Sequence, residues 1–292
     1  MTIARPVAPR VAIIGAGRAG RALALALTRV AMPVRVCVRR ATELPAPLEC
    51  NLGPWDKVLS DTDIVLLAVP DDAIGDAAAS IAAAPLGGAV VLHCSGLRDR
   101  RALAVLDGRA KGLGSFHPLQ TLAGDSEAAG RLHAAFAVLE GDAEAIAAGR
   151  ALASGLGMEA LVIEAAQKPR YHAAAVIVSN YTVTLAAVAA KLAREAGVPA
   201  EAASRLFLPL LAGTVKNLEL LGPASALTGP IRRGDVGTIE AHLAALSEAD
   251  RRLYAVLGLR AVELAREAGL APERAALLAD RLAASQPGSS GA

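Results

Sequence analysis

The sequence predicts an α/β domain built on a parallel sheet, followed by an all-α domain. In the first half of the chain, short apolar runs typical of buried strands alternate with stretches that carry apolar residues at helical spacing. Strands that alternate with helices pair in parallel, because each helix forms the crossover to the next strand. Beyond about Glu164 the strand pattern ends and alanine- and leucine-rich helical patterns take over. We therefore expect a first domain over 1–165, a helical second domain over 166–284 and a disordered tail over 285–292.

Local patterns place each element of these domains. The proline-rich stretch 41–58 predicts an irregular connection rather than a long helix. The uncharged run 173–190 contains polar side chains at its centre, so it predicts a helix buried in protein rather than a membrane span. Strands are expected at 10–14, 33–40, 63–69, 88–96, 112–118, 134–141 and 158–165. Helices are expected at 18–31, 71–84, 98–106, 142–156, 169–197, 200–222 with an interruption near Pro209, 235–248, 249–269 and 271–285.

The composition argues against several classes of protein. Aromatic residues make up 2% of the chain, and 30 basic residues nearly balance 28 acidic ones, unlike a nucleic-acid-binding or membrane-surface protein. The three cysteines, Cys37, Cys50 and Cys94, show no metal-binding spacing and are typical of reduced thiols in a cytoplasm. The histidines and acids also lack the spacing of a metal site. We therefore expect a cytoplasmic protein with no metal, no membrane span and no nucleic-acid partner.

The stretch "GAGRAG" follows a predicted strand and opens a predicted helix. Glycines in G-x-G-x-x-G spacing at such a place are typical of a Rossmann dinucleotide-binding turn. The first glycine allows a tight turn, the second lets the backbone approach a pyrophosphate, and the third lets helix and strand pack closely. The helix N-terminus adds free N–H groups and a positive dipole end for the phosphates. The predicted cofactor-binding residues here are Gly15, Ala16, Gly17, Arg18, Ala19 and Gly20.

Arg39 and Arg40, at the end of the second predicted strand, indicate which dinucleotide binds. NAD-binding chains place an acidic residue about 20 residues after the fingerprint, whereas this chain has two arginines there. Guanidinium groups suit a 2′-phosphate, so we expect NADPH (NADP); a solvated basic turn is the alternative. Val69 and Pro70, after the third strand, are expected to line the cofactor's other side. The acidic pair that begins at Asp71 is expected to cap the next helix.

Four motifs together resemble a known family. They are "HCSG" from His93, "GSFHPLQT" from Gly114, "YHAAAVIVSNY" from Tyr171 and "LTGPIRRGD" from Leu227. From Val11 to about Leu270 the chain resembles the Rossmann-like oxidoreductases that carry a C-terminal domain of unknown function 2520. That family is related to 6-phosphogluconate dehydrogenase, pyrroline-carboxylate reductase and ketopantoate reductase. The resemblance implies a Rossmann domain, an all-α domain like the C-terminal domain of 6-phosphogluconate dehydrogenase, a nicotinamide cofactor, a substrate cleft between the domains and a homodimer.

His117 is the first candidate catalytic residue. It ends a predicted strand, and Pro118 stiffens the turn that follows. Ligands of open α/β sheets bind beyond the carboxyl ends of the strands, where Ser95 is also a candidate substrate-binding residue. An imidazole titrates near neutral pH and can give a proton to a carbonyl that receives hydride. A structural histidine that fixes the turn is the alternative.

His172 and Asn180, on the long predicted helix, are the other candidate catalytic residues. Ser179, a candidate substrate-binding residue, and Asn180 lie seven and eight residues after His172, so all three share one helix face. Polar residues on an apolar helix need partners or solvent, which a cleft provides. The related dehydrogenases carry a lysine and an asparagine four apart on this helix. Here Val176 follows His172 at that distance and Lys168 precedes the helix, which leaves the proton donor open. Satisfied polar residues between packed helices are the alternative.

The "LTGPIRRGD" motif supplies the last candidates. Gly229 and Pro230 predict a rigid loop that approaches a ligand closely. Arg233, or Arg232, would bind a substrate carboxylate through two parallel hydrogen bonds. A plain turn between helices is the alternative.

These motifs predict an NADPH-dependent oxidoreductase that reduces a small carbonyl or imine substrate. A 2-keto acid is the expected carbonyl substrate, and ketopantoate is one candidate. Two other functions stay open: an NAD(P)-dependent oxidation of the prephenate-dehydrogenase type, and a non-catalytic NADPH-binding sensor. The expected partners are a small-molecule substrate and a second copy of the chain in a homodimer.

Overall fold

The computed structural model describes residues 8–86, 88–123 and 126–285. The chain divides into two compact units, Met1–Tyr181 and Thr182–Ala292. Helix α6 (Lys168–Val178) therefore belongs to the first unit, whereas the sequence-based division assigns it to the second domain. Of the predicted tail over 285–292, only Ser285 lies within the described residues.

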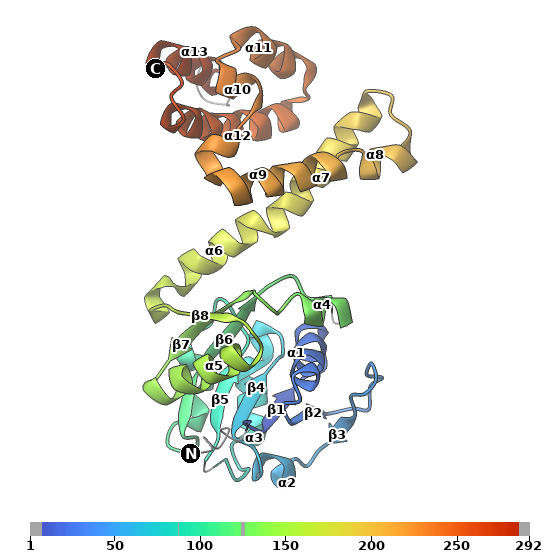
Figure 1. The fold of residues 1–292 in the computed structure, drawn as a ribbon, viewed down its shortest axis with the longest axis vertical. Coiled ribbons are helices and arrows are strands. Elements are labelled where there is room, and N and C mark those ends of the chain that lie inside the picture. Colours follow the sequence, from blue (N-terminus) through green and yellow to red (C-terminus); the bar gives the residue numbers. More distant parts are fainter. Residues whose placement is uncertain (1–7, 87, 124–125, 286–292) are drawn as a thin grey trace, which may run out of the picture. The chain divides into compact units, whose positions relative to one another are not determined.

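An eight-stranded sheet forms the centre of the first unit (Figure 1). Its strand order is β3-β2-β1-β4-β5-β6-β7-β8, and neighbouring strands from β3 to β6 are all parallel. The first six strands have the order of a doubly wound dinucleotide-binding fold, so the predicted Rossmann domain is confirmed. The strands are β1 (Val11–Ile14), β2 (Val34–Val38), β3 (Cys50–Leu52), β4 (Ile64–Leu67), β5 (Val90–His93), β6 (Gly112–Leu119), β7 (Phe136–Gly141) and β8 (Glu159–Val162).

The last two strands run against the other six. β7 pairs antiparallel with β6, and β8 pairs parallel with β7, so the expectation of parallel pairing throughout is wrong for this edge of the sheet. Within its described part, the connection 120–135 contains only the short helix α4 (Ser126–Gly130) in place of a full crossover helix. The antiparallel register sets Ser115 of β6 opposite Glu140 of β7.

Two apolar clusters cover the two faces of the sheet. One contains side chains of α1, α4 and α5, and the other contains side chains of α2, α3 and the 3-10 helix η2. Phe116 lies in the first cluster and Leu113 in the second, because successive residues of a strand point to opposite faces. The bounds are α1 (Arg18–Arg29), α2 (Asp56–Leu59), η1 (Asp71–Ala73), α3 (Ile74–Ile81), η2 (Arg100–Leu106), α5 (Ala143–Gly155) and η3 (Ala165–Gln167).

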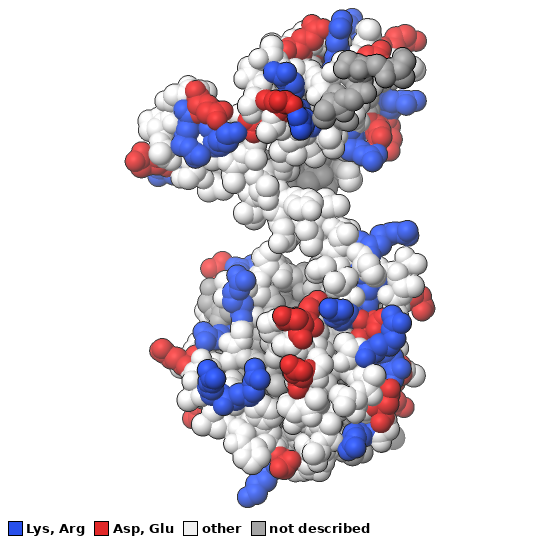
Figure 2. All heavy atoms as spheres, turned by 180° about the vertical axis from the view of Figure 1, so that it is seen from behind, with Lys and Arg blue, Asp and Glu red and all other residues white. Residues whose placement is uncertain are grey.

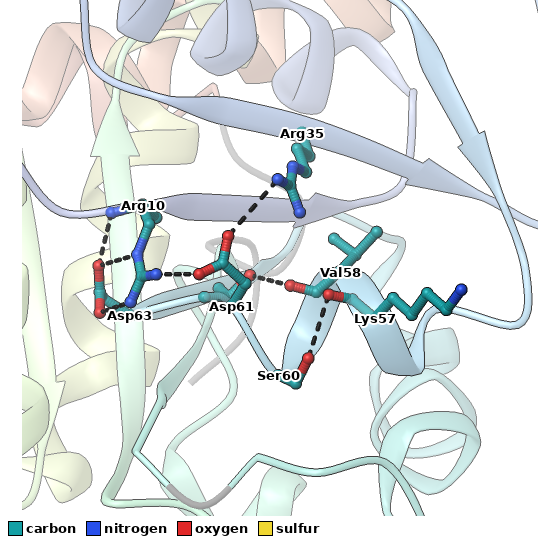
Figure 3. A network of polar contacts seen from close by, with 8 residues as sticks. Arg10, Arg35, Lys57, Val58, Ser60, Asp61 and Asp63 are labelled. Atoms are coloured by element: carbon teal, nitrogen blue, oxygen red, sulfur yellow. Dashed lines mark hydrogen bonds and ion pairs between the residues drawn. The ribbon is translucent and has the colours of Figure 1, made fainter.

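Arg10 links the amino-terminal ends of β1 and β4 (Figure 3). Its backbone N–H donates to the Asp63 carboxylate at 2.8 Å, and its guanidinium donates to the same group at 3.0 and 2.9 Å. Arg10 also pairs with Asp61, which pairs with Arg35 of β2 at 3.5 Å. The hydrogen bond from Arg10 holds the pKa of Asp63 below its usual value. This network aligns β1, β2 and β4 at their amino-terminal ends. Ligands of such sheets bind at the opposite, carboxyl ends of the strands.

The second unit is all-α, as predicted. Its core combines side chains of α11, α12 and α13, among them Ile239, Val262 and Leu278. The predicted interruption near Pro209 falls at Phe207, between α8 and α9, and a second one occurs at Gly222, whose φ is 72°. The bounds are α7 (Asn180–Glu195), which begins in the first unit, α8 (Ala200–Leu206), α9 (Leu208–Ala226), α10 (Gly229–Arg233), α11 (Val236–Ala245), α12 (Glu248–Glu267) and α13 (Pro272–Ala283).

The uncharged stretch 173–190 exposes apolar side chains that neither unit buries by itself, so its predicted burial in protein stays a prediction. Val178 and Val183 are 72% and 70% exposed. Among the described residues, one helical stretch, Ala165–Glu195, is long and apolar enough to cross a membrane by length and composition alone. In Figure 2 the surface over α6 is white apart from charged groups near its start. An apolar surface of this kind is typical of a protein–protein interaction site.

Candidate functional site

A cavity of about 630 Å³ opens where β1, β2 and β4 end. Since ligands of this fold bind at the carboxyl ends of the strands, the cavity lies where a dinucleotide is expected. Five of the predicted cofactor-binding residues line it, namely Gly15, Ala16, Arg39, Arg40 and Val69. The others lie directly beside these: Gly17, Arg18, Ala19 and Gly20 lead into α1, and Pro70 follows Val69.

The glycines of the β1–α1 turn have the geometry that a phosphate-binding turn needs. Gly15 has a φ of +111°, and a Cβ there would lie 2.5 Å from the Ala68 carbonyl oxygen. A Cβ on Gly20 would collide with the carbonyl oxygen of Gly15, so this glycine allows α1 to pack against the turn. Gly17 precedes the first residue of α1, and a Cβ on it would meet open space. The open side of Gly17 is where a pyrophosphate would approach the helix N-terminus.

Some lining residues of this cavity carry no recognisable motif. Trp55, from the proline-rich stretch, lines it, and its indole N–H donates to the Asn51 carbonyl oxygen at 3.1 Å. Arg21 also supports the turn, because its Nε donates to the Ala16 carbonyl oxygen at 2.8 Å. Neither contact follows a spacing rule, so sequence reasoning missed both. The remaining unpredicted polar residues of the lining are Thr42, Asp76 and Ser80.

A second group of polar residues lies at the ends of β5 and β6. We call it the strand-end cluster; it consists of Ser95, Gly96, Ser115, His117, Lys168, Tyr171 and His172. Ser115 and His117 are two residues apart on β6, so both point to the sheet face that carries α3 and η2. The other members come from the turn after β5 and from the first two helical turns of α6. The structure thus brings the predicted His117, His172 and Ser95 together.

Lys168 is the member that sequence reasoning placed outside the helix. Helix α6 begins at Lys168, so Lys168 and His172 lie one turn apart on the same helix face. The ammonium is fully buried and donates to Ser115 Oγ at 2.7 Å and to the Ser95 carbonyl oxygen at 3.2 Å. Burial lowers the pKa of Lys168, and the nearby carboxylates, with Glu140 foremost, oppose that shift.

His117 has a different chemistry from the one its sequence context suggests. Its Nδ1 lies 2.7 Å from the Tyr171 hydroxyl oxygen, and its ring lies edge-on to that of His172 at 6.0 Å between centroids. Burial, together with the neighbouring His172 and Lys168 and against the charge of Asp71, lowers the pKa of His117 to about 4. Burial also raises the pKa of Tyr171 to about 12. His117 is therefore a neutral imidazole at pH 7, which makes Lys168 the better source of a proton.

Gly96 lets the two histidines converge. A Cβ on Gly96 would lie 2.6 Å from His172 Nδ1 and 2.9 Å from His117 Cε1, so only glycine fits between the two rings. His172 Nδ1 is itself buried and has no hydrogen-bond partner among the described residues. A buried ring nitrogen without a partner costs stability unless a ligand or water satisfies it. The cluster therefore contains a polar atom that is ready to bind a ligand.

The turn after β5 is held by side chains rather than by the expected helix cap. Asp71 does not cap the following helix; its carboxylate accepts from Ser95 Oγ at 2.7 Å. Ser95 Oγ in turn accepts from the backbone N–H groups of Leu97 and Arg98. His93 is structural, since its ring nitrogens contact the Asp99 carbonyl oxygen at 3.1 Å and the Ser95 N–H at 3.2 Å. Burial lowers the pKa of His93 to about 4.

The remaining predicted site residues lie elsewhere in the chain. Asn180 begins α7, eight residues beyond His172, which is about 12 Å along a helix axis. Ser179 lies at the junction of α6 and α7. Gly229 and Arg233 are the two ends of α10 in the second unit, and the neighbouring Arg232 donates to the Ala268 carbonyl oxygen at 2.8 Å. The roles of Ser179, Asn180, Gly229 and Arg233 in ligand binding stay predictions. In the described ranges, no group of three or more His, Cys, Asp and Glu side chains is placed to hold a metal ion.

Two family models match the chain in segments that both contribute to these sites. A family described as NADP oxidoreductase, coenzyme F420-dependent, matches residues 10–95, which include the β1–α1 turn and Ser95. A domain of unknown function, DUF2520, matches residues 135–261, which include Lys168 and His172. A search among curated proteins found no match. The predicted NADP cofactor agrees with the description of the first family.

Solved structures share the architecture over most of the chain. A protein from Bacteroides fragilis described as an NADP oxidoreductase is 27% identical, with a TM-score of 0.69, over 86% of this chain and 96% of its own. A protein from Thermotoga maritima is 23% identical, with a TM-score of 0.63, over 94% and 98%. Pyrroline carboxylate reductase from Plasmodium falciparum, solved with NADP bound, is 13% identical, with a TM-score of 0.60, over 92% and 98%. Residues 10–95 therefore match an NADP oxidoreductase family and residues 135–261 match the domain of unknown function DUF2520, on a fold that the chain shares with Rossmann-type NADP oxidoreductases.

Proposed function

We propose that the chain is an NADPH-dependent reductase of a small carbonyl or imine compound. The observation that carries the proposal is the pairing, in one unit, of a dinucleotide-sized cavity with a buried lysine among polar groups at the ends of the neighbouring strands. A 2-keto acid is the proposed carbonyl substrate, with ketopantoate the first to test. The imine alternative has support from the fold shared with a pyrroline carboxylate reductase.

The residues of the cavity fit NADPH. Gly17 leaves open space at the N-terminus of α1 for the pyrophosphate. Arg39 and Arg40 line the same cavity and are exposed, so both guanidinium groups are available for a 2′-phosphate. No acidic residue follows the end of β2 in the lining of this cavity. The cavity therefore lacks the carboxylate that usually binds the ribose hydroxyls of NAD.

The strand-end cluster supplies the proton and orients the substrate in this proposal. Bound NADPH supplies the hydride to the substrate carbon. Lys168 donates the proton to the substrate oxygen or nitrogen, because its two hydrogen bonds leave one of the three ammonium N–H groups for the substrate. Tyr171 and His117, both neutral, and the unpartnered His172 Nδ1 position the reacting group. Arg233 is the proposed carboxylate-binding residue of the second unit.

Cofactor binding tests the first half of the proposal. Trp55 is the single tryptophan of the chain and lines the cavity, so NADPH should quench its fluorescence on binding. Charged hydrogen bonds contribute about 1.5–3 kcal/mol, so we expect NADPH to bind at least about tenfold tighter than NADH. Replacing Arg39 and Arg40 with alanine should abolish that preference, whereas Arg29→Ala, at the other end of α1, should keep it. Equal affinities in the unmodified protein would contradict the cofactor assignment.

Turnover tests the second half. NADPH oxidation is followed by absorbance with a panel of 2-keto acids and cyclic imines. With an accepted substrate, Lys168→Met should keep the NADPH affinity and lose about 10²–10⁴-fold in turnover, as expected for a lost general acid. His117→Gln should lose less, since it removes only a positioning contact. If the protein binds NADPH but consumes it with no compound of the panel, a non-catalytic sensor is favoured. If it reduces NAD while it oxidises a cyclic hydroxy acid, the oxidation of the prephenate-dehydrogenase type is favoured.

We also propose that the chain acts as a homodimer in the cytoplasm. The second unit exposes large apolar side chains that its own core does not cover, and most of them lie on α7, α8 and α9. A second copy is a better cover than a lipid bilayer, because Ser179, Asn180 and Tyr181 interrupt the apolar stretch near its middle. The cysteines are free, as expected in a reducing compartment. Cell fractionation would test the location, and recovery of the protein in the membrane fraction would contradict it.

A further inference from the structure

Glu140 is a buried carboxyl group to which the proposed reaction gives no role. It is 4% exposed, and its Oε1 accepts from the Arg100 backbone N–H at 3.3 Å. Its Oε2 accepts from Ser115 Oγ at 3.4 Å, and Ser115 Oγ accepts from Lys168 Nζ at 2.7 Å. Three groups that can exchange protons therefore form one continuous line from the carboxyl group to the strand-end cluster.

The other end of this line reaches solvent through a different cavity. Glu140 lines a cavity of about 360 Å³ that shares no lining residue with the cavity of the β1–α1 turn. Arg101, Val162 and Glu164 line the same space and are exposed, so it opens at the surface. Lys168, by contrast, is fully buried, so bulk water does not reach its ammonium group in this structure.

We propose that Glu140 and Ser115 form a proton relay that reloads Lys168 from the second cavity. The relay rests on the proposed function, in which Lys168 gives one proton to the substrate in each reduction. The neutral amine then takes the Ser115 hydroxyl proton, and the Ser115 oxygen takes the proton of the Glu140 carboxylic acid. The Glu140 carboxylate regains its proton from water in the second cavity. Each turnover thus moves one proton inward, which matches the single proton that the reduction consumes.

The electrostatics of the cluster favour such a transfer. Burial raises the pKa of Glu140, and the negative charge of Asp99 raises it further. The Arg100 N–H, the charge of Lys168 and the Ser115 hydrogen bond lower it, but they do not cancel the rise. Burial lowers the pKa of Lys168, against the charges of Glu140, Asp99 and Asp71. The two shifts bring an acid and a base that normally differ by about six pKa units closer together, so the transfer costs less free energy. Two other titratable groups of this face, His93 and His117, have pKa values of about 4 and are neutral at pH 7.

Proton exchange at Lys168 tests the relay without a substrate. The chain has five lysines, so selective isotope labelling allows Lys168 to be followed by NMR, with Lys168→Met for assignment. In the full chain, Glu140→Gln keeps the shape of the side chain and removes its proton. We expect the exchange of the Lys168 Nζ protons with water to slow by at least about tenfold, as for the loss of a proton-transferring group. Ser115→Ala should slow it similarly.

Two further variants separate a relay from a structural role. Glu140→Asp keeps a carboxyl group on β7 and should restore part of the exchange. Glu144→Gln, on the adjacent helix α5, removes an exposed carboxylate that pairs with Lys111 at 3.7 Å and should leave the exchange unchanged. The pKa of Lys168 should also fall in Glu140→Gln, because the side chain at position 140 can then no longer ionise and favour the ammonium form. Unchanged exchange and titration in Glu140→Gln would overturn the relay.

The same variants distinguish the relay from the proposed function. Where a substrate is turned over, Glu140→Gln should lower kcat and leave the NADPH affinity, read from Trp55 fluorescence, unchanged. If NADPH neither binds nor is consumed, the proposed function fails, and slowed exchange in Glu140→Gln would still support the path between Glu140 and Lys168. If NADPH is consumed at the unmodified rate by Glu140→Gln, the relay is overturned and the reductase stands.

Discussion

At the scale of single residues, the candidate site depends on groups whose burial no sequence rule announces. Lysine is almost never fully buried without partners, yet Lys168 has no exposed surface and is held by Ser95 and Ser115. The sequence placed His117 correctly at a strand end, but the protonation state of its ring follows from the packing around it. Residue type and spacing therefore predicted which polar side chains lie together at the strand ends, and burial determines which of them are charged.

Gly96 provides a prediction at this scale. Gly96→Ala should separate the His117 and His172 rings, because the new Cβ would lie 2.6 Å from His172 Nδ1. We expect turnover to fall at least about tenfold and the melting temperature to drop, as is typical of overpacking at about 1–3 kcal/mol. Gly75→Ala, in the first turn of α3, is the matched control, since its Cβ would meet nothing within 4 Å and alanine favours a helix. Equal effects of the two substitutions would contradict the role of Gly96.

The lowered pKa of His117 predicts how stability depends on pH. Its pKa falls from 6.5 to about 4 on folding, so the unfolded chain binds the proton more readily than the folded one. Stability from this group is present above pH 6.5 and is lost as the pH falls toward 4, by at most roughly 3 kcal/mol. Between pH 7.5 and pH 5, the melting temperature should therefore fall less for His117→Gln than for the unmodified chain. His133→Gln, at an exposed position, should behave like the unmodified chain.

At the scale of elements, the sequence predicted most of the first unit because its signals are local. The β1–α1 turn follows from three glycines, and each has the geometry that its role requires. The three-residue strand β3 was missed, since it lies in a proline-rich stretch and is too short to show a period. The direction of β7 was also missed, because apolar alternation is the same for parallel and antiparallel strands. Strand direction is set by the connection, and 120–135 carries no pattern that identifies it.

The two glycines that flank the start of α1 allow a paired prediction. Gly17→Ala should keep the melting temperature and weaken NADPH binding at least about tenfold, because its Cβ would occupy the open space in which the pyrophosphate is expected. Gly20→Ala should lower the melting temperature strongly, because its Cβ collides with the Gly15 carbonyl oxygen. Trp55 fluorescence measures the affinity and differential scanning calorimetry measures the stability. A Gly17→Ala protein that binds NADPH normally would show that the phosphates approach elsewhere.

At the scale of the whole molecule, the uncovered helices of the second unit are the feature that requires explanation. Leu208, Leu210 and Leu220 of α9 are 55–67% exposed, although leucine in a folded chain is usually buried. The sequence indicated an apolar helix at 173–190 but could not say what covers it, because composition does not distinguish a core helix from an interface helix. An apolar surface of several helices in one unit is typical of a homodimer interface.

A mass measurement tests this interpretation. At micromolar concentration, light scattering should give twice the 29.6 kDa of one chain. Leu210→Glu together with Leu220→Glu should yield the single-chain mass, because two buried charges would have no partners at the interface. Leu277→Glu, on α13, also alters an exposed leucine but lies outside α7–α9 and should leave the dimer intact. If the unmodified protein has the mass of a single chain, the homodimer is wrong. Binding of the unmodified protein to lipid vesicles would also count against it.

The reversal of β7 has a consequence for how this fold tolerates changes in length. β6 and β7 pair antiparallel, and Ser115 lies opposite Glu140 in their register. This register depends on contacts between the two strands and not on the number of residues in the connection that joins them. Gly114 and Gly141 fix that alignment, because a Cβ on either would press on the backbone of the other strand. Insertions or deletions in 120–135 can therefore accumulate without separating the hydroxyl from the carboxyl group. We therefore expect Ser115 and Glu140 to stay opposite each other in variants whose connection between β6 and β7 is longer or shorter.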